Sequence, residues 1–115
     1  MFILFVIIIN LIKKKKKMEY ISNAFSLQMI DAENYSVNVT TLTEEEFNNV
    51  KPTAHSVVGH PDTANVLGVE YKRSSIKLNI GDILYVAQLS GGRLPEGATK
   101  LPEGFSFKYL KVTIS

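Results

Sequence analysis

The sequence of 115 residues contains no cysteine, only two histidines and only two arginines. The absence of cysteine excludes disulfides, thiolate nucleophiles and cysteine-type zinc sites. The histidines are His55 and His60, and the carboxylates are scattered along the chain, so the sequence does not favour a dedicated metal site. We therefore expect chemistry that uses no metal and no other cofactor.

Basic charge is scarce once one run of lysines is set aside. The formal net charge is +2, but residues 13–17 are five consecutive lysines. Without them, eight basic residues remain against eleven acidic ones, which is a charge of −3 over residues 18–115. A protein that binds duplex nucleic acid needs a broad basic face to displace counterions. The composition therefore favours a small anionic ligand, held by one or two cations, over duplex nucleic acid.

Residues 1–17 differ in composition from the rest of the chain. Residues 1–12 are almost wholly apolar, but a helix of that length spans about 18 Å, less than the roughly 30 Å of a bilayer core. A secretory signal carries its positive charges before the apolar run, whereas here the lysines follow it. We favour a non-native leader from an upstream start codon over a peripheral membrane anchor. We expect one domain over residues 18–115, no stable membrane insertion and a cytoplasmic location.

The apolar pattern from residue 18 onward predicts a strand-rich domain. Residues 83–89 are expected to form the central strand, because apolar side chains occur on both of its faces. Alternation over residues 35–41 predicts a half-buried strand. The apolar positions of the last strand change phase, which predicts a bulge near Tyr109. Further strands are expected at 19–23, 69–71, 75–78 and 105–114, with a hairpin turn at 79–82.

Two helices are indicated by their capping residues. Thr43 and Glu46 form a capping box for a helix that ends near Val50, so the acidic triplet there is better interpreted as a helix start than as a carboxylate site. The second helix is predicted to begin at Pro61, directly after His60.

His60 lies in the stretch around which the chain is organised, residues 56–68. A buried strand is predicted to end at Val58, and the helix that begins at Pro61 is closed by Gly68. His60 is then the cap residue, beside free N–H groups that could hold a phosphate. Two interpretations stay open, a titratable group beside an anion site or a histidine that only caps a helix.

The loop after the predicted central strand contains Arg93 and Glu96. Arginine binds phosphate with two parallel hydrogen bonds, and binding groups are often found on loops at strand ends. Together with His60 these residues supply an acid, a carboxylate and a cation. That is the minimum set for metal-free cleavage of a phosphodiester beside a ribose hydroxyl.

The sequence Leu-Pro-Glu-Gly occurs twice in this loop, at residues 94–97 and 101–104. Proline followed two residues later by glycine favours a tight turn, so two such turns are expected. The second copy offers Glu103 as a rival to Glu96. We favour Glu96, because it lies three residues after an arginine.

Three segments of the chain resemble a known family. Residues 22–26 are Ser-Asn-Ala-Phe-Ser, residues 58–64 are Val-Gly-His-Pro-Asp-Thr-Ala, and residues 84–97 contain Leu-Tyr-Val-Ala-Gln-Leu and then Gly-Arg-Leu-Pro-Glu-Gly. In this order they resemble the viral ring nucleases. These are the type III anti-CRISPR proteins that degrade cyclic tetra-adenylate and so switch off type III CRISPR signalling. The resemblance covers residues 18–115.

The resemblance implies a small mixed α/β fold, with a central five-stranded sheet flanked by short helices. It also implies a symmetric homodimer that binds cyclic tetra-adenylate on its two-fold axis, and a phosphodiesterase reaction without metal. In that reaction the ribose 2′-hydroxyl attacks the adjacent phosphorus. The product is linear di-adenylate with a 2′,3′-cyclic phosphate.

The resemblance also implies roles for individual residues. His60 matches the general acid that protonates the leaving 5′-oxygen, and Arg93 and Glu96 match the pair that orients and stabilises the reacting centre. The ligand-binding positions that it implies are Asn23, Ser26, Gln28, Gly59 and Arg73. Two other functions remain open. One is a non-catalytic dimer that sequesters a cyclic oligoadenylate, and the other, which the charge disfavours, is a nucleic-acid-binding regulator.

Overall fold

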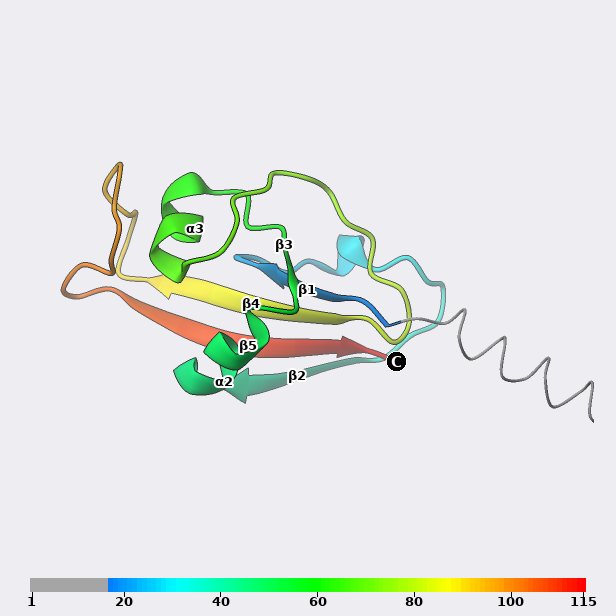
Figure 1. The fold of residues 1–115 in the computed structure, drawn as a ribbon. Coiled ribbons are helices and arrows are strands. Elements are labelled where there is room, and N and C mark those ends of the chain that lie inside the picture. The colour runs from blue at the N-terminus through cyan, green and yellow to red at the C-terminus, as the bar shows by residue number, and fades with distance from the viewer. Residues whose placement is uncertain (1–16) are drawn as a thin grey trace, which may run out of the picture.

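The computed structural model describes residues 17–115, which form a mixed sheet with helices packed against it (Figure 1). In chain order the elements are β1 (Glu19–Ser22), the 3-10 helix η1 (Leu27–Met29), β2 (Val37–Leu42), α2 (Glu44–Val50), β3 (His55–Ser56), α3 (Pro61–Leu67), β4 (Ile83–Ser90) and β5 (Ser106–Ile114). The five strands have the order β2-β5-β4-β1-β3. β1 is parallel to β3 and β4, whereas β5 is antiparallel to β4 and β2.

This arrangement confirms the predicted fold class, a small α+β domain with a mixed five-stranded sheet. Nearly all of the predicted leader lies outside the described residues. Within residues 17–115, no helix is both long enough and apolar enough to cross a membrane.

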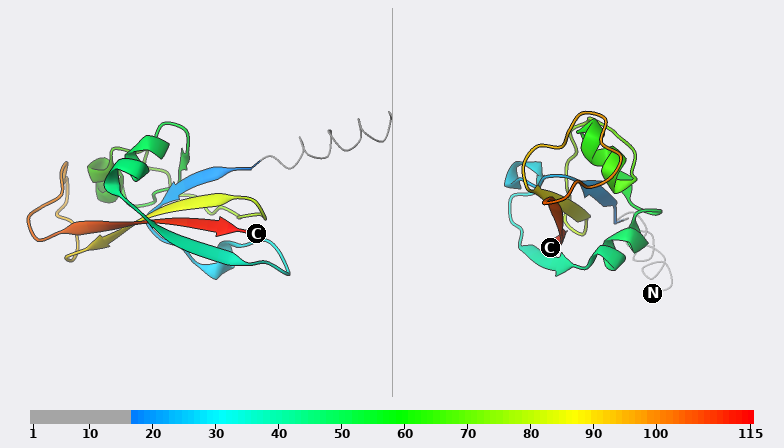
Figure 2. Two further views of the ribbon diagram at one scale, coloured as in Figure 1. Left: turned by 90° about the horizontal axis from the view of Figure 1, so that it is seen from below. Right: turned by 90° about the vertical axis from the view of Figure 1, so that its left-hand side faces the viewer.

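The two faces of the sheet bury separate clusters of apolar side chains. The central strand β4 contributes to both, with Tyr85 and Ala87 on the face that α2 and α3 cover, and Leu84 and Val86 on the opposite face. Figure 2 shows both helices on the same side of the sheet. Phe47 is the fully buried anchor of α2. The prediction that this strand is buried on both faces is confirmed.

Two tyrosines on the helix-covered face have raised pKa values. Burial is the main cause that raises the pKa of Tyr85 far above its ordinary value, and Glu19 adds to it because Tyr85 OH donates a 2.7 Å hydrogen bond to its Oε1. Burial also raises the pKa of Tyr109, and the charge of Glu44 adds to the effect. Both phenols therefore stay protonated at neutral pH and serve the packing of the sheet.

The predicted bulge near Tyr109 is wrong, because β5 pairs with β4 in one continuous register from Ser106 to Thr113. Phe107 and Tyr109 pack on the helix-covered face, where the ring centroids of Tyr109 and Phe47 are 4.6 Å apart. Val112 and Ile114 pack on the opposite face. The apolar phase changes because each face of β5 is covered along a different part of the strand.

The strands predicted at 69–71 and 75–78 are also wrong. Each segment makes only a single bridge, Tyr71 with Val58 and Leu78 with Ile30. β1 occupies the place between β4 and β3, so the chain between α3 and β4 runs outside the ordered strands. The turn at 79–82 does form, with the Asp82 N–H donating to the Asn79 carbonyl at 3.0 Å. It leads from a loop into β4, and no hairpin results.

β2 begins two residues later than predicted and is more exposed than its alternation suggested. In the part of the chain that the structure describes, it is an edge strand whose ladder is to β5. Val37 is half-buried in the cluster opposite the helices, but Val39 is 49% exposed. The prediction of a half-buried strand therefore holds only for its ends.

The start of α2 confirms the predicted capping box. Thr43 Oγ1 accepts a hydrogen bond from the Glu46 N–H at 3.1 Å, and Glu46 Oε1 accepts one from the Thr43 N–H at 2.9 Å. The hydrogen bond from the Thr43 N–H to the Glu46 carboxylate is the main cause that holds the pKa of Glu46 below its ordinary value, and the Thr43 side chain adds to it. The helix ends at Val50, before Pro52, as predicted.

Candidate functional site

His60 caps the N-terminus of α3, as the sequence predicts. Its backbone is extended, with φ −126° and ψ 117°, and its Nδ1 accepts a 3.4 Å hydrogen bond from the Thr63 N–H. Pro61 is the first helical residue, and Gly68 closes the helix at φ 74°. Because Nδ1 is the acceptor, a neutral ring carries its proton on Nε2. The cap therefore leaves Nε2 free of any capping role.

The hydroxyl of Thr63 also lies close to the ring of His60. Its Oγ1 is 3.3 Å from Nδ1, and Thr63 is 5% exposed. A hydroxyl can act as donor or acceptor. It can accept a hydrogen bond from Nδ1–H when the ring holds two protons. The hydroxyl is thus a partner for Nδ1 with or without a proton, whereas the hydrogen bond from the Thr63 N–H forms only when Nδ1 carries none.

A cavity of about 470 Å³ contains His60 in its lining together with three other predicted residues, Asn23, Gly59 and Arg73. Asn23 directly follows β1, and His60 comes four residues after the end of the parallel strand β3. The carboxyl ends of parallel strands meet at one edge of a sheet, which is where ligands bind in many α/β proteins. The topology therefore brings these two side chains together from distant parts of the sequence.

Arg73 reaches this cavity through a contact between two extended segments. The Lys72 N–H donates a 3.0 Å hydrogen bond to the Val58 carbonyl, which places Arg73 beside Gly59. A Cβ added to Gly59 would lie 3.5 Å from Arg73 Cγ and 3.7 Å from its Cα. These are ordinary van der Waals distances, so Gly59 and Arg73 pack side by side and a methyl group at Gly59 would also fit.

The remaining predicted ligand-binding residues, Ser26 and Gln28, line an adjoining cavity of about 280 Å³. Ser26 caps η1, because its Oγ accepts a 3.3 Å hydrogen bond from the Gln28 N–H. The two cavities share three lining residues, Val57, Ser74 and Ser75. Six of the eight predicted site residues therefore lie in one continuous region.

Arg93 and Glu96 do not line either of these cavities. Both are exposed in the loop between β4 and β5. The two Leu-Pro-Glu-Gly copies form the predicted pair of tight turns, with the Ala98 N–H bonded to the Pro95 carbonyl and the Phe105 N–H to the Pro102 carbonyl, each at 3.1 Å. The two copies thus share a backbone conformation as well as a sequence.

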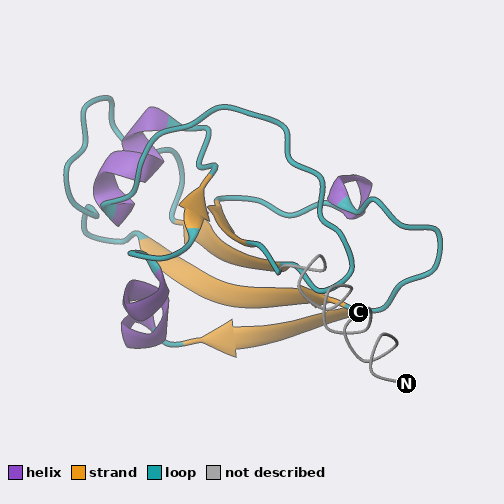
Figure 3. Cartoon of the chain, turned by 45° about the vertical axis from the view of Figure 1, so that its right-hand side comes forward, coloured by secondary structure: helices purple, strands orange, loops and turns teal. Residues whose placement is uncertain are grey.

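Only the first turn is bound to α3 among the hydrogen bonds of residues 17–115. The Gly97 N–H donates to Asp62 Oδ1 at 3.0 Å, and Asn65 Nδ2 donates to the Ala98 carbonyl at 3.2 Å. Leu94, 5% exposed, anchors the same turn in the protein interior. Figure 3 shows the loop beside α3. The structure therefore places Glu96 in the turn attached to the helix that His60 caps.

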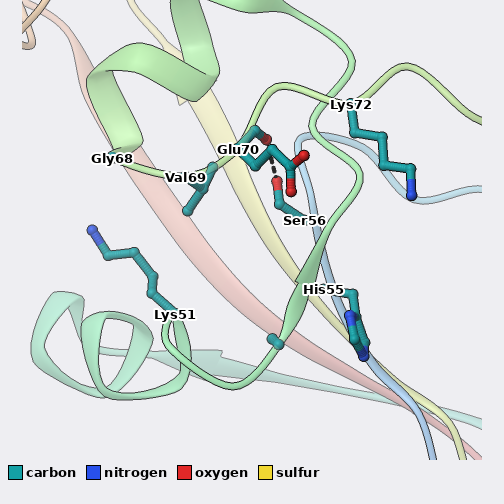
Figure 4. A pocket seen from close by; sticks show the side chains of 8 residues that line it. Lys51, His55, Ser56, Gly68, Val69, Glu70 and Lys72 are labelled. Atoms are coloured by element: carbon teal, nitrogen blue, oxygen red, sulfur yellow. Dashed lines mark hydrogen bonds between the residues drawn. The ribbon is translucent and has the colours of Figure 1, made fainter.

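A further cavity, of about 300 Å³, is lined by His55, Lys51, Lys72 and Glu70 among others (Figure 4). Lys51 Nζ donates a 2.6 Å hydrogen bond to the Leu67 carbonyl at the C-terminus of α3. Free carbonyls give that helix end a partial negative charge, which explains the lysine structurally. The lining of this cavity includes none of the residues predicted to form the site, so His55 lies apart from them.

Sequence reasoning did not identify several residues of the region around His60. Ser74 and Ser75 line both cavities, but Ser75 is the first residue of the segment 75–78 that was predicted as strand, and Ser74 directly precedes it. Asp62 and Asn65 are three positions apart on α3, a spacing that puts side chains on one helix face and that could have indicated a joint contact. Their hydrogen-bond partners in the loop, however, are 35 and 33 residues away in the sequence.

Comparison with protein families matches residues 19–106 to the family described as STIV B116-like. Among solved structures, B116 of Sulfolobus turreted icosahedral virus (STIV) is similar to this chain with a TM-score of 0.68 and 22% sequence identity. The match covers 84% of this chain and 98% of that one, and it shows a shared fold. No curated protein matches the sequence. Because the family match extends over most of its length, the chain belongs to the STIV B116-like family, which is named after a viral protein.

Proposed function

We propose that this protein is a metal-independent ring nuclease that cleaves cyclic tetra-adenylate to linear di-adenylate and thereby switches off type III CRISPR signalling. The proposal rests on the sequence resemblance described above and on one structural observation. That observation is the cavity in which a histidine, His60, and an arginine, Arg73, lie together with the amide of Asn23. A cation can bind the phosphate of a phosphodiester, an acid can assist its cleavage, and an amide can bind the adenine base.

In the proposed reaction the ribose 2′-hydroxyl loses its proton to solvent water as it attacks the adjacent phosphorus, and the bond from phosphorus to the 5′-oxygen breaks. His60 acts in its doubly protonated form, gives the proton on Nε2 to the leaving 5′-oxygen and becomes neutral. Arg93 and Glu96 orient and stabilise the reacting phosphate. Two such cleavages convert one ring into two linear di-adenylates, each ending in a 2′,3′-cyclic phosphate.

A single chain does not bring all of the proposed catalytic residues to one cavity, since Arg93 and Glu96 lie outside the cavity of His60. A homodimer with the ring on its two-fold axis would present equivalent linkages to both copies of His60. Sedimentation of the full chain should then show twice the monomer mass of 12.8 kDa. A monomer that cleaves the ring at full rate would contradict the dimer.

The function is tested by incubating the protein with cyclic tetra-adenylate in the presence of EDTA and separating the products by chromatography. The expected product is linear di-adenylate with a 2′,3′-cyclic phosphate. The same incubation with His60→Asn is the control for a contaminating nuclease. No product, or activity that returns only when a divalent ion is added, would contradict the proposal.

A second candidate, sequestration of a cyclic oligoadenylate without cleavage, is favoured by the exposed positions of Arg93 and Glu96. Binding alone needs the cavities but needs neither a nearby carboxylate nor an acid. Calorimetry with the ring, followed by recovery of the ligand, separates the two functions. Recovery of intact ring from a tight complex would support sequestration.

A further inference from the structure

The loop that carries Arg93 and Glu96 is attached to α3 by two side chains that follow His60 closely in the sequence. Asp62 Oδ1 accepts the Gly97 N–H at 3.0 Å, and Asn65 Nδ2 donates to the Ala98 carbonyl at 3.2 Å. The two bonds run in opposite senses, one accepted and one donated by the helix. They therefore hold two consecutive residues of the loop, Gly97 and Ala98, against one face of α3.

The base of this loop is formed by glycines. Gly91 and Gly92 have φ values of 116° and 120°, and Gly104 has φ 86°, all of which L side chains rarely adopt. A Cβ on Gly91 would lie 2.7 Å from the Gly104 carbonyl oxygen, so the two ends of the loop are in close contact. Glycines place few limits on the direction in which the loop leaves the sheet. The contacts with α3, together with the buried side chain of Leu94, therefore fix the direction of the first turn.

We propose that Asp62 and Asn65 are positioning residues, which hold the segment from Arg93 to Glu96 beside the helix terminus that His60 caps. The catalytic consequence rests on the proposed function, but the attachment itself does not. Glu96 is adjacent to Gly97, and Asp62 is two residues from His60. The hydrogen bond between Asp62 and Gly97 thus connects Glu96 to His60 with only three residues in between, namely Gly97, Asp62 and Pro61.

The second Leu-Pro-Glu-Gly copy is an internal comparison for this role. It forms the same turn with the same 3.1 Å hydrogen bond, between the Phe105 N–H and the Pro102 carbonyl. Among the hydrogen bonds of the described residues, none joins that turn to α3. The copies therefore differ in this attachment, and also in their leucines, since Leu94 is buried and Leu101 is exposed. Both differences favour Glu96 over Glu103 as the carboxylate of the site.

Asp62 could instead act only through its charge, because a carboxylate in the first turn of a helix stabilises the helix dipole. Asp62→Asn separates these roles, since the amide oxygen keeps an acceptor for the Gly97 N–H while the charge is lost. Asp62→Ala removes both. A positioning role therefore predicts that Asn rescues function and Ala does not, whereas a charge role predicts that both fail alike.

The attachment is tested first by hydrogen exchange in the full-length protein, a measurement that needs no activity. Asp62→Ala should accelerate amide exchange in residues 94–99 at least tenfold, while Asp62→Asn should stay close to wild type. Residues 101–105, in the second turn, are the matched control and should not change in either variant. Unchanged exchange at 94–99 in Asp62→Ala would overturn the attachment.

The positioning role is tested by single-turnover cleavage of cyclic tetra-adenylate at saturating protein. Asp62→Ala should lower the rate about 10- to 100-fold, with binding of the ring nearly unchanged, because a displacement of about 1 Å at a reacting centre costs up to about 10²-fold. Asp62→Asn should cleave at close to the wild-type rate. Faster exchange with an unchanged cleavage rate would overturn the positioning role. If the wild type itself does not cleave the ring, the proposed function fails, and the exchange result still decides the attachment.

Discussion

The Gly97 N–H donates a 3.0 Å hydrogen bond to Asp62 Oδ1, and this contact joins the loop after β4 to the helix that begins after His60. His60 and Glu96 are 36 residues apart in the sequence. The contact brings their neighbours within hydrogen-bond distance. The candidate site is therefore formed by two separate segments of the chain. The role of each segment can be tested by a substitution in it and a matching control substitution elsewhere in the chain.

Replacing His60 separates its two roles. Asparagine is a favourable N-cap residue, so His60→Asn should keep the free energy of unfolding near wild type, whereas His60→Ala should lower it by about 0.5–2 kcal/mol. Both variants should lower the single-turnover cleavage rate by about 10²- to 10⁴-fold, the usual contribution of a general acid. His55→Ala is the control and should leave the rate unchanged. A wild-type rate in His60→Asn would show that His60 only caps the helix.

The two glutamates of the repeated turns form a matched pair. Glu96→Gln should lower the cleavage rate by about 10²-fold, because it removes a charged group from the reacting centre. Glu103→Gln should cleave like the wild type, since its turn is not attached to α3. Both residues are exposed, so thermal unfolding should change little in either variant. Equal loss of rate in both variants would refute the choice of Glu96.

The base of the loop should be sensitive to any side chain at Gly91. A Cβ there would meet the Gly104 carbonyl oxygen at 2.7 Å and Phe105 Cα at 2.9 Å, whereas a Cβ on Gly97 would meet nothing within 4 Å. Gly97→Ala should cost about 1–2 kcal/mol for its positive φ alone. Gly91→Ala should cost more, because the clash adds to the backbone strain. Urea unfolding measures both, and equal losses would argue against the close contact of the loop ends.

The capping box of α2 predicts how stability depends on pH. The Thr43 hydrogen bonds lower the pKa of Glu46 in the folded protein below its ordinary value of 4.5, so the unfolded chain binds this proton more readily. The stabilisation is therefore present above the unfolded pKa and is lost as the pH falls through the folded pKa. The stability advantage of wild type over Glu46→Gln should shrink between about pH 6 and about pH 3. Glu45→Gln, one residue earlier on the same helix, is the control. An advantage that does not change with pH would contradict the capping interaction.

The sequence by itself determined the features that depend on residues close together in the chain. The capping box of Thr43 and Glu46 and the helix from Pro61 to Leu67 are set by side chains that bond backbone groups within one helical turn. The two Leu-Pro-Glu-Gly turns are likewise local, because proline restricts φ and glycine permits the positive φ that each turn needs within four residues. The buried strand β4 was also predictable, since its own side chains are apolar on both faces.

Only the tertiary structure decided which distant segments meet. β1 lies between β4 and β3, and residues 69–71 and 75–78 stay outside the ordered strands although their apolar pattern favoured strands. The same pairing brings Asn23 and His60 to one cavity, and the Lys72 bond to Val58 adds Arg73 to it. Strand order and backbone contacts of this kind depend on which surfaces remain to be covered once the whole chain is packed. A pattern read along one segment carries no information about its partner, and the site residues are therefore joined by the fold and not by their spacing.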